Sequence, residues 1–388
     1  MTSAVLSILF LATLVWVVLG IILRRRHRLR TPADETHKAR TDDGWALALY
    51  RYRPAPGDTP RGLEPVIVCH GLLSNRFNVD LDERHSVARH LRADGFDVWV
   101  MELRGHGRSV RAATGRLWPF DWTIDDYIRR DLPAVIEYVC RETGADSVHW
   151  VGHSLGGMIL YAACALGLTG RIRSAVLTDV PADMSLIRSR KLAGAFYGKI
   201  VPIIPPFLFI PFVLVLGWIS PRLLLPKYGI RSRRTMLRIV ANGIVDVGCS
   251  RVALHLAQIL KRGRFVSWDG TADYEAGLDR IHFPIMQLAA ACRRSPERTV
   301  RALIERAPVT DKIYVRLGRS EGFSEDYNHF TVLLGERAHE EIFPIIGDFL
   351  SRRSTCAQRG TRAQQDTSTT TGQPDRLRTA GDPFRRPP

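Results

Sequence analysis

The chain has 388 residues, of which 45% are hydrophobic, so it is long enough for one large domain with an insertion or for two domains. Its formal net charge is +16, but residues 1–30 carry +5, residues 183–265 carry +12 and the tail from residue 352 carries +5, so the rest carries −6. This segmental basicity, without a zinc-finger, RNA-binding or aromatic-basic groove pattern, gives no reason to expect nucleic acid as a partner.

Residues 4–23, AVLSILFLATLVWVVLGIIL, form an uncharged apolar run that is followed at once by RRRHRLR. A helix of this length spans about 30 Å, one bilayer core. A signal peptide has its positive charges before the apolar run and a small-residue cleavage site after it, which is the reverse of the order here. We therefore expect an uncleaved transmembrane anchor at 4–23, with the catalytic domain on the cytoplasmic side of the membrane. A cleaved export signal is the alternative.

The rest of the chain alternates between strand and helix patterns. The segment 36–53 predicts a β-hairpin around Asp42-Asp43-Gly44. Short apolar runs then predict six strands, at 65–71, 97–103, 148–152, 175–180, 284–290 and 312–318. Helices are predicted at 83–95, at 124–143, directly after Ser154 and at 338–352. This order indicates an α/β fold, with a mostly parallel sheet and helices on both of its faces.

One long segment interrupts this alternation between two sheet strands. We expect residues 183–283 to form an inserted hydrophobic and basic cap on a core made of residues 31–182 and 284–351. The segment 353–388, rich in Thr, Gln, Arg, Pro and Gly, is expected to be disordered because it cannot bury enough apolar surface.

Within the cap, residues 200–226 are nearly apolar enough for a second membrane span, but six prolines argue against a straight one. Two interpretations stay open. The segment is either ordinary cap core, or its apolar face dips into the bilayer. The basic residues of 227–238 favour an anionic membrane lipid as a partner.

A candidate nucleophile stands in Gly152-His153-Ser154-Leu155-Gly156, between a predicted strand and a predicted helix. Small residues two positions before and after Ser154 permit the sharp turn that exposes a catalytic hydroxyl. The Leu155 N–H would then lie at a helix N-terminus and face the substrate oxygen. The Leu72 N–H, in the loop after an earlier strand, is the expected second donor to the oxyanion.

Three stretches carry a family resemblance: HGLLSN (70–75), DGFDVWVMELRGHGRS (94–109) and VGHSLGGM (151–158). Together they resemble the α/β-hydrolase superfamily, especially its lipase and esterase members. They also resemble the hydrolase relatives of polyhydroxyalkanoate synthases, which carry Cys where this chain has Ser154. The resemblance implies an α/β-hydrolase fold and acyl chemistry on Ser154.

The base is expected after the last strand, where Asp326-Tyr327-Asn328-His329-Phe330 resembles the family segment that carries it. His329 is therefore the candidate base, and His339 is the weaker one. The position usual for the acid, after the strand at 284–290, holds no carboxylate before Glu297. Asp179 follows the strand after the nucleophile and is the preferred acid. Glu297, or a dyad without an acid, remains open.

These residues predict a membrane-anchored serine hydrolase that cleaves a lipophilic acyl ester through an acyl-enzyme on Ser154. Acyl transfer through the same intermediate is an alternative, and so is a relative that binds lipid without catalysis. No cofactor is implied, because no Gly-rich phosphate loop follows the first strand and no metal-ligand cluster has usable spacing.

Overall fold

The computed structural model describes most of the chain. The described residues are 2–54, 63–111, 121–187, 190–195, 198–199, 206–221, 230, 232–243, 250–292 and 297–354. Apart from residues 353 and 354, the tail that we expect to be disordered lies outside them.

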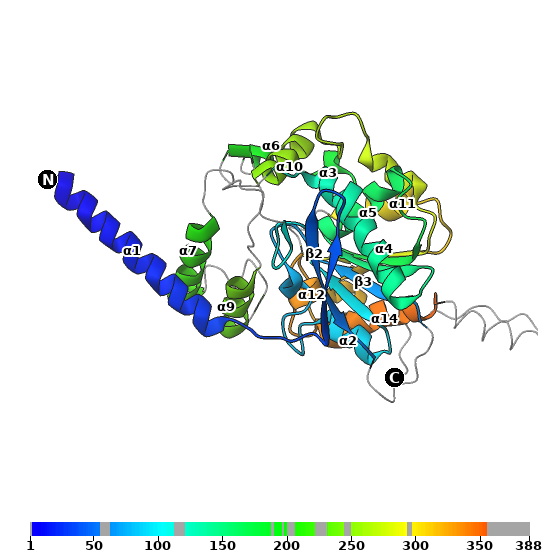
Figure 1. Cartoon of the computed structure of the whole chain (residues 1–388), viewed down its shortest axis with the longest axis horizontal. Helices are drawn as coiled ribbons and strands as arrows, with labels where there is room; N and C mark the ends of the chain where they lie inside the picture. The colour runs from blue at the N-terminus through cyan, green and yellow to red at the C-terminus, as the bar shows by residue number, and fades with distance from the viewer. Residues whose placement is uncertain are drawn as a thin grey trace, which may run out of the picture.

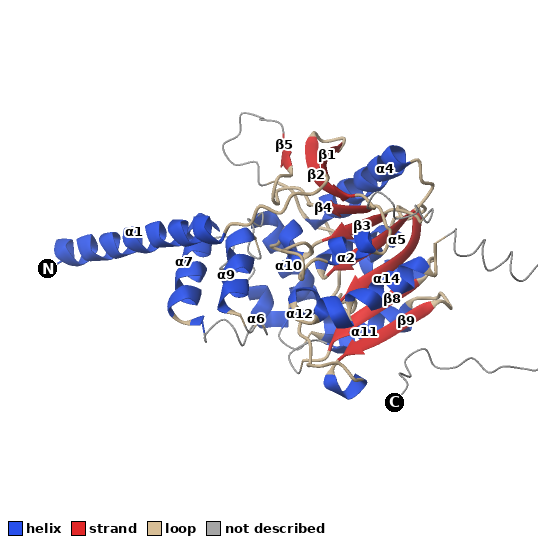
Figure 2. Ribbon diagram, turned by 90° about the horizontal axis from the view of Figure 1, so that it is seen from below, coloured by secondary structure: helices blue, strands red, loops and turns tan. Residues whose placement is uncertain are grey.

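The centre of the molecule is a twisted nine-stranded sheet (Figure 2). Its strands are β1 (Glu35–Arg40), β2 (Trp45–Tyr52), β3 (Val66–Cys69), β4 (Val98–Met101), β5 (Val110–Arg111), β6 (Val148–His153), β7 (Ile172–Thr178), β8 (Ile285–Ala290) and β9 (Lys312–Leu317). The order is β1-β2-β4-β3-β6-β7-β8-β9, and β5 pairs with β2. From β4 to β9 all neighbours are parallel, whereas β1, β2 and β5 pair antiparallel. The predicted hairpin and the six predicted strands after it are confirmed.

The sheet is buried on both faces because its strands alternate side chains between two hydrophobic clusters. In β3, Ile67 and Cys69 belong to the cluster that includes helix residues of the 124–164 region. Val66 and Val68 belong to the other cluster, with residues of the last helices of the core. This arrangement explains why the sequence shows short continuous apolar runs instead of an apolar and polar alternation.

The helices cover both faces of the sheet (Figure 1). Their bounds are α1 (Thr2–His27), α2 (Val87–Ala93), α3 (Ile124–Asp126), α4 (Leu132–Thr143), α5 (Leu155–Ala165), α6 (Arg190–Ala195), α7 (Pro206–Ile219), α9 (Arg233–Asn242), α10 (Ser250–Arg262), α11 (Glu297–Arg306), α12 (Thr331–Leu334), α13 (Ala338–Glu341) and α14 (Phe343–Ser351). Short 3₁₀ or π segments are η1 (Arg76–Asn78), η2 (Tyr127–Asp131), η3 (Met184–Leu186), η5 (Tyr274–Arg280) and η6 (Arg319–Glu321).

Two helices that the sequence predicts as continuous are interrupted, and a proline accompanies each interruption. The predicted helix 124–143 contains the π turn η2 directly before Pro133 at the start of α4. The predicted helix 338–352 divides at Ile342, and Pro344 stands in the first turn of α14. Proline has no N–H to donate to the carbonyl four residues earlier, so it weakens the helix in the turn that precedes it.

Among the described residues, no helix combines the length and the apolar character that crossing a membrane requires. The prediction of a transmembrane anchor at 4–23, with a single-pass membrane location and a cytoplasmic catalytic domain, is therefore wrong. The apolar run of α1 also supplies packing surface within the chain, because its second half packs on α7 and α9 (Figure 1). A Cβ added to Gly20 would lie 2.4 Å from the Cβ of Pro211 in α7.

The predicted cap contacts two different parts of the molecule. The helices α7 and α9 pack on each other and on α1, whereas α10 contacts α3 and η3, and η5 packs on α5. A Cβ added to Gly277 in η5 would lie 1.8 Å from the carbonyl oxygen of Tyr161 in α5, so η5 lies directly against a core helix. The division into a core and a cap at 183–283 stays a prediction.

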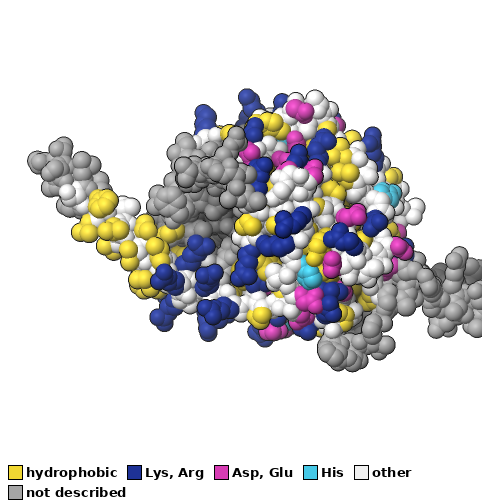
Figure 3. Space-filling view, in the orientation of Figure 1, with side chains coloured by type: hydrophobic (Ala, Val, Ile, Leu, Met, Phe, Trp, Pro, Cys, Tyr) yellow, Lys and Arg dark blue, Asp and Glu magenta, His cyan; other side chains and the backbone are white. Residues whose placement is uncertain are grey.

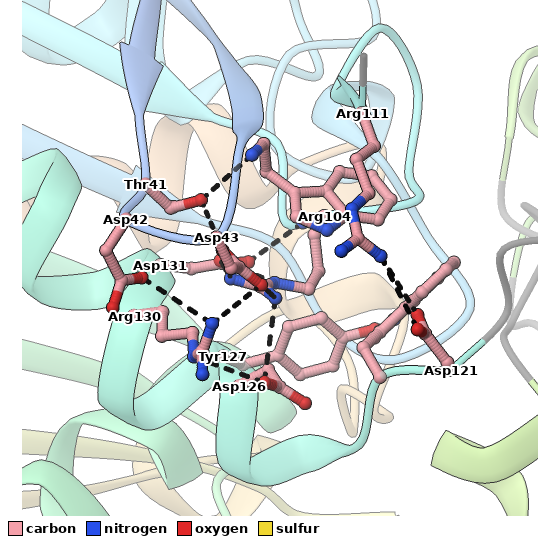
Figure 4. A network of polar contacts seen from close by, with 12 residues as sticks. Thr41, Asp42, Asp43, Arg104, Arg111, Asp121, Asp126, Tyr127, Arg130 and Asp131 are labelled. Carbon is pink, nitrogen blue, oxygen red and sulfur yellow. Dashed lines mark hydrogen bonds and ion pairs between the residues drawn. The ribbon is translucent and has the colours of Figure 1, made fainter. Parts of the chain in front are cut away.

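A buried ion-pair network joins the hairpin turn to the helical layer (Figure 4). The Arg104 side chain is 1% exposed and donates from Nε to Asp131 Oδ1 at 2.7 Å and from Nη1 to Asp43 Oδ2 at 2.7 Å. The Arg104 N–H also donates to Asp131 Oδ2 at 2.9 Å. Arg130 lies 3.0 Å from Asp43 as well. The network therefore fixes the loop that follows β4 between the β1–β2 turn and η2.

Buried His149 in β6 is expected to make the stability of the fold depend on pH. Its Nδ1 lies 2.9 Å from Ser174 Oγ in β7, and its Nε2 lies 3.0 Å from Ser354 Oγ after α14. Burial lowers the pKa of His149 from 6.5 to about 4. Because the unfolded chain then binds a proton that the folded chain does not, the free energy of unfolding should fall as the pH drops below about 6.5.

We expect a loss of up to about 1.4 kcal/mol per pH unit from this one group between about pH 6.5 and about pH 4. Urea unfolding of the wild type and of His149→Gln, at about pH 6.5 and about pH 5, measures it. The variant should lose less stability on acidification than the wild type. An equal loss in both proteins would exclude His149 as the source.

Candidate active site

Ser154 lies on a strained turn between β6 and α5. Its backbone has φ 51° and ψ −116°, values that a residue with a Cβ rarely adopts. A Cβ added to Gly152 would lie 2.7 Å from the carbonyl oxygen of Gly156, and one added to Gly156 would lie 2.6 Å from that of Cys69. Both glycines are therefore required by close backbone packing, and the turn leaves Ser154 partly exposed while its neighbours are buried.

The loop after β3 lies against this turn. A Cβ added to Gly71 would lie 3.2 Å from the Cβ of Ser154. His70 holds the loop, because the Leu103 N–H donates to its Nε2 at 3.2 Å and its Nδ1 then donates to the Gly71 carbonyl at 2.8 Å. Leu72 follows Gly71 directly, and Leu155 occupies the first turn of α5, where backbone N–H groups have no partner within the helix.

His329 and Asp179 come together although they are far apart in sequence. His329 Nδ1 lies 2.6 Å from Asp179 Oδ2, a short, charge-assisted geometry. The Asp179 side chain is 1% exposed, whereas that of His329 is 39% exposed. The His329 ring also lies 4.7 Å, centroid to centroid, from the ring of His153, the residue before Ser154. One nitrogen of His329 is thus held by a carboxylate, while part of the ring remains open to a substrate.

Asp179 is fixed by the carboxyl ends of two neighbouring strands. It follows β7 directly with φ 51°, and its N–H donates to the Leu288 carbonyl in β8 at 2.7 Å. Its second carboxylate oxygen accepts from the Ala290 N–H at 3.1 Å. The other candidate acid, Glu297, pairs instead with Arg316, whose Nε lies 3.3 Å from Glu297 Oε2. The local geometry therefore favours Asp179 over Glu297.

His153 precedes the candidate nucleophile, and its buried ring lies beside that of the candidate base. Its Nδ1 lies 3.1 Å from Thr178 Oγ1 and 3.2 Å from the Thr178 carbonyl oxygen. Burial, and to a smaller extent a charge on His329, hold the pKa of His153 well below its usual range. A histidine that stays neutral adds no positive charge beside His329, so it serves as a neutral packing surface for the His329 ring.

Sequence reasoning missed the residues that hold the His329 loop. The Asn328 side-chain oxygen accepts from the backbone N–H groups of Phe330 at 2.9 Å and Thr331 at 3.0 Å, so it caps the turn that carries His329. The Tyr327 hydroxyl donates to Glu341 at 2.8 Å. Asn328 belongs to the motif Asp326-Tyr327-Asn328-His329-Phe330 that identifies His329 in the sequence. Its capping role depends on a turn that the sequence does not specify. No sequence signal links Tyr327 to Glu341.

A family model for the α/β hydrolase fold matches residues 64–197. Lipase 1 of Drosophila melanogaster is 26% identical over 276 residues, which cover 65% of this chain and 60% of that protein. Lipase lipl-3 of Caenorhabditis elegans is 34% identical over 133 residues, which cover 31% of this chain and 32% of that protein. The human lysosomal acid lipase/cholesteryl ester hydrolase is 31% identical over 138 residues, 34% of each chain. The matched part thus spans between about a third and 60% of these relatives.

Among solved structures, a thermophilic esterase from Thermogutta terrifontis is similar with a TM-score of 0.55 and 18% identity, covering 83% of this chain and all of the other. At this identity the likeness establishes the fold alone. Together with the sheet order, these matches confirm the resemblance to the superfamily and its lipase and esterase members. The chain has the α/β-hydrolase fold and is similar to lipases and esterases.

Proposed function

We propose that the protein is a serine hydrolase that cleaves a lipophilic carboxylic ester through an acyl-enzyme on Ser154. The single observation that carries this proposal is the 2.6 Å contact between His329 Nδ1 and Asp179 Oδ2, beside the strained turn of Ser154. A histidine held in this way through Nδ1 presents its other nitrogen as a base. Asp179 has the role of orienting His329 and stabilising the imidazolium.

In the proposed reaction, Ser154 Oγ attacks the ester carbonyl carbon while His329 Nε2 takes the hydroxyl proton. The N–H groups of Leu72 and Leu155 donate to the oxyanion that forms. The C–O bond to the alcohol then breaks, and His329 returns the proton to the leaving oxygen. Water, deprotonated by His329, attacks the acyl-enzyme and releases the acid, which restores Ser154.

The substrate class follows from the relatives and from the composition of the middle segment. The names of the curated relatives include triacylglycerol lipases of Arabidopsis thaliana and Bos taurus and a cholesteryl ester hydrolase of Homo sapiens. In this chain, residues 200–226 are almost entirely apolar. Both facts support a lipophilic acyl ester as the substrate. The basic residues of 227–238 support an anionic lipid surface as the partner that presents it.

The proposal is tested by fluorophosphonate labelling of the folded protein, followed by hydrolysis of acetyl, butyryl and octanoyl p-nitrophenyl esters. We expect rapid labelling and a kcat/KM that rises at least about tenfold from acetyl to octanoyl, because each buried CH₂ contributes about 0.8 kcal/mol. Folded protein that does not react would instead identify a lipid-binding relative without catalysis. Labelling with a preference for acetyl would refute the lipophilic substrate alone. Ester cleavage that yields a new ester when an alcohol is added would identify acyl transfer.

A further inference from the structure

A cavity of about 1150 Å³ lies where α1 ends, and none of Ser154, Asp179 and His329 lines it. Its walls come from the last turns of α1, the linker 28–36, the 3₁₀ turn η1, the loop after β4 and the end of α9. We call it the α1 cavity. Figure 3 shows dark blue Lys and Arg side chains gathered at the base of the projecting helix α1. The volume is sufficient for a small organic ligand or a lipid head group.

The lining of the α1 cavity is strongly cationic. Six of the lining residues are arginines, namely Arg24, Arg25, Arg28, Arg30, Arg76 and Arg108. Among the described lining residues the acidic one is Glu102, which is 2% exposed. Its carboxylate already accepts hydrogen bonds from the Arg108 N–H at 2.7 Å, the Tyr50 hydroxyl at 3.0 Å and the Arg76 N–H at 3.4 Å. The Glu102 carboxylate is therefore hydrogen-bonded to two backbone N–H groups and one tyrosine hydroxyl.

Most of these guanidinium groups lack a counter-charge within the described part of the chain. Arginines such as Arg104 are paired. By contrast, no carboxylate in the described part of the chain lies within ion-pair distance of five of the six lining arginines, Arg24, Arg25, Arg28, Arg30 and Arg108. The exception is Arg76, which lies 4.0 Å from Asp80. Its guanidinium also stacks 4.2 Å from the centre of the Tyr50 ring and donates to the Thr31 carbonyl at 2.7 Å, so it is held rigidly in the wall.

The walls of the α1 cavity are joined by one residue, Asn242 at the end of α9, through its side chain and its backbone carbonyl. Its Oδ1 accepts from the Leu29 N–H at 2.8 Å, and its Nδ2 donates to the His27 carbonyl at 3.0 Å. Its own carbonyl accepts from Asn75 Nδ2 at 2.9 Å. The end of α1, the linker and the loop before η1 are thus fixed relative to one another, which lowers the entropy cost of binding a ligand there.

Further arginines surround His27, next to the α1 cavity. Burial lowers the pKa of His27, and the charges of Arg26, Arg238, Arg234 and Arg233 lower it further. These four arginines are additional to the six that line the α1 cavity. The concentration of cations at the junction of α1 and α9 creates a positive potential that attracts anions.

We propose that the α1 cavity binds the phosphate group of an anionic ligand. Arginine presents a planar fork of donors that matches phosphate oxygens, and the lining contains six arginines and no lysine. Ile21, Leu29 and Phe77 add apolar lining, which suits a ligand whose phosphate is esterified to a hydrocarbon part. Two sources share this chemistry, the head group of an anionic phospholipid and a small soluble organic phosphate. The site lies apart from the ester-hydrolase site and does not depend on the proposed function.

The test compares the wild type with the triple variant Arg25→Gln, Arg28→Gln, Arg30→Gln. The matched control is Arg262→Gln, Arg298→Gln, Arg319→Gln, which removes the same charge from exposed arginines outside the α1 cavity. Binding is measured to vesicles of phosphatidylcholine with and without phosphatidic acid, and, by calorimetry, to glycerol 3-phosphate. The cavity variant should lose about tenfold or more in affinity, since each charge-assisted hydrogen bond contributes more than about 1.4 kcal/mol. The control should stay within about twofold.

Each outcome decides a part of the proposal. Binding to phosphatidic acid vesicles without binding to glycerol 3-phosphate identifies a lipid head group, and the reverse identifies a soluble phosphate. An equal loss in the control variant would show diffuse basicity and overturn the site. The site would also be overturned if neither probe bound. It would be overturned as well if the wild type bound an RNA oligomer more tightly than either probe and the cavity variant lost that RNA binding. Urea unfolding of all three proteins verifies that the variants are folded, whether or not Ser154 is reactive.

Discussion

Replacing Ser154 by alanine should lower kcat for ester hydrolysis by about 10⁶-fold and abolish fluorophosphonate labelling. In the proposed mechanism the hydroxyl oxygen forms the acyl-enzyme, so without it His329 and the oxyanion donors would have nothing to activate. Alanine keeps the Cβ, and the backbone at φ 51° therefore keeps its strain. The free energy of unfolding should change by less than about 1 kcal/mol.

A second substitution at the same position separates the strain from the chemistry. Ser154→Gly should be as inactive as Ser154→Ala but more stable than the wild type, by about 1 kcal/mol, because glycine adopts a positive φ without steric cost. Stopped assays with octanoyl ester and urea unfolding of both variants measure the two quantities. Substantial hydrolysis by folded Ser154→Ala would show that Ser154 is not the nucleophile.

Asp179→Asn should lower kcat by about 10⁴-fold while the fold is retained. The Ala290 N–H donates to one side-chain oxygen of Asp179, so the asparagine oxygen would keep that bond and turn its NH₂ group toward His329 Nδ1. His329 would then have to accept at Nδ1 and carry its proton on Nε2, where it could no longer take the proton of Ser154. Asparagine also tolerates the positive φ of this position, so the backbone is not disturbed.

The matched control for Asp179→Asn is Glu297→Gln, which removes the other candidate carboxylate. Because Glu297 pairs with Arg316, we expect this control to keep its kcat within about twofold. The pH profile of kcat/KM for each protein provides the second measurement. If Glu297→Gln lost the activity and Asp179→Asn retained it, Glu297 would be the acid. If both retained it, His329 would act in a dyad.

Much of the fold could be predicted from the sequence because each buried strand is a short apolar run next to a turn signal. The residues 65–71 and 97–103 show this pattern, and both contain a parallel strand of the sheet. Local signals also place Ser154, since two glycines at fixed spacing are needed for close backbone packing around it. The strands and the turn at Ser154 depend on residues that are neighbours in the sequence, so they can be predicted from one sequence alone.

What the sequence could not provide depends on contacts between distant segments. The apolar run 4–23 satisfies every local rule for a membrane anchor, and the packing of Gly20 on Pro211 is invisible until α1 and α7 are placed in space. The same limit explains why the α1 cavity was missed. Its arginines lie in three separate stretches that the sequence presents as unrelated basic residues.

The pairing of His329 with Asp179 has a consequence for how the protein acquires its activity. The two residues are separated by 150 positions, and the whole predicted cap lies between them. A contact of such long range closes a large loop, so we expect it to form late in folding. If His329 is the base, a nascent chain that has left the ribosome as far as Ser154 and Asp179 should stay inert. Activity would require that the last strand of the sheet and the loop after it have been synthesised and docked.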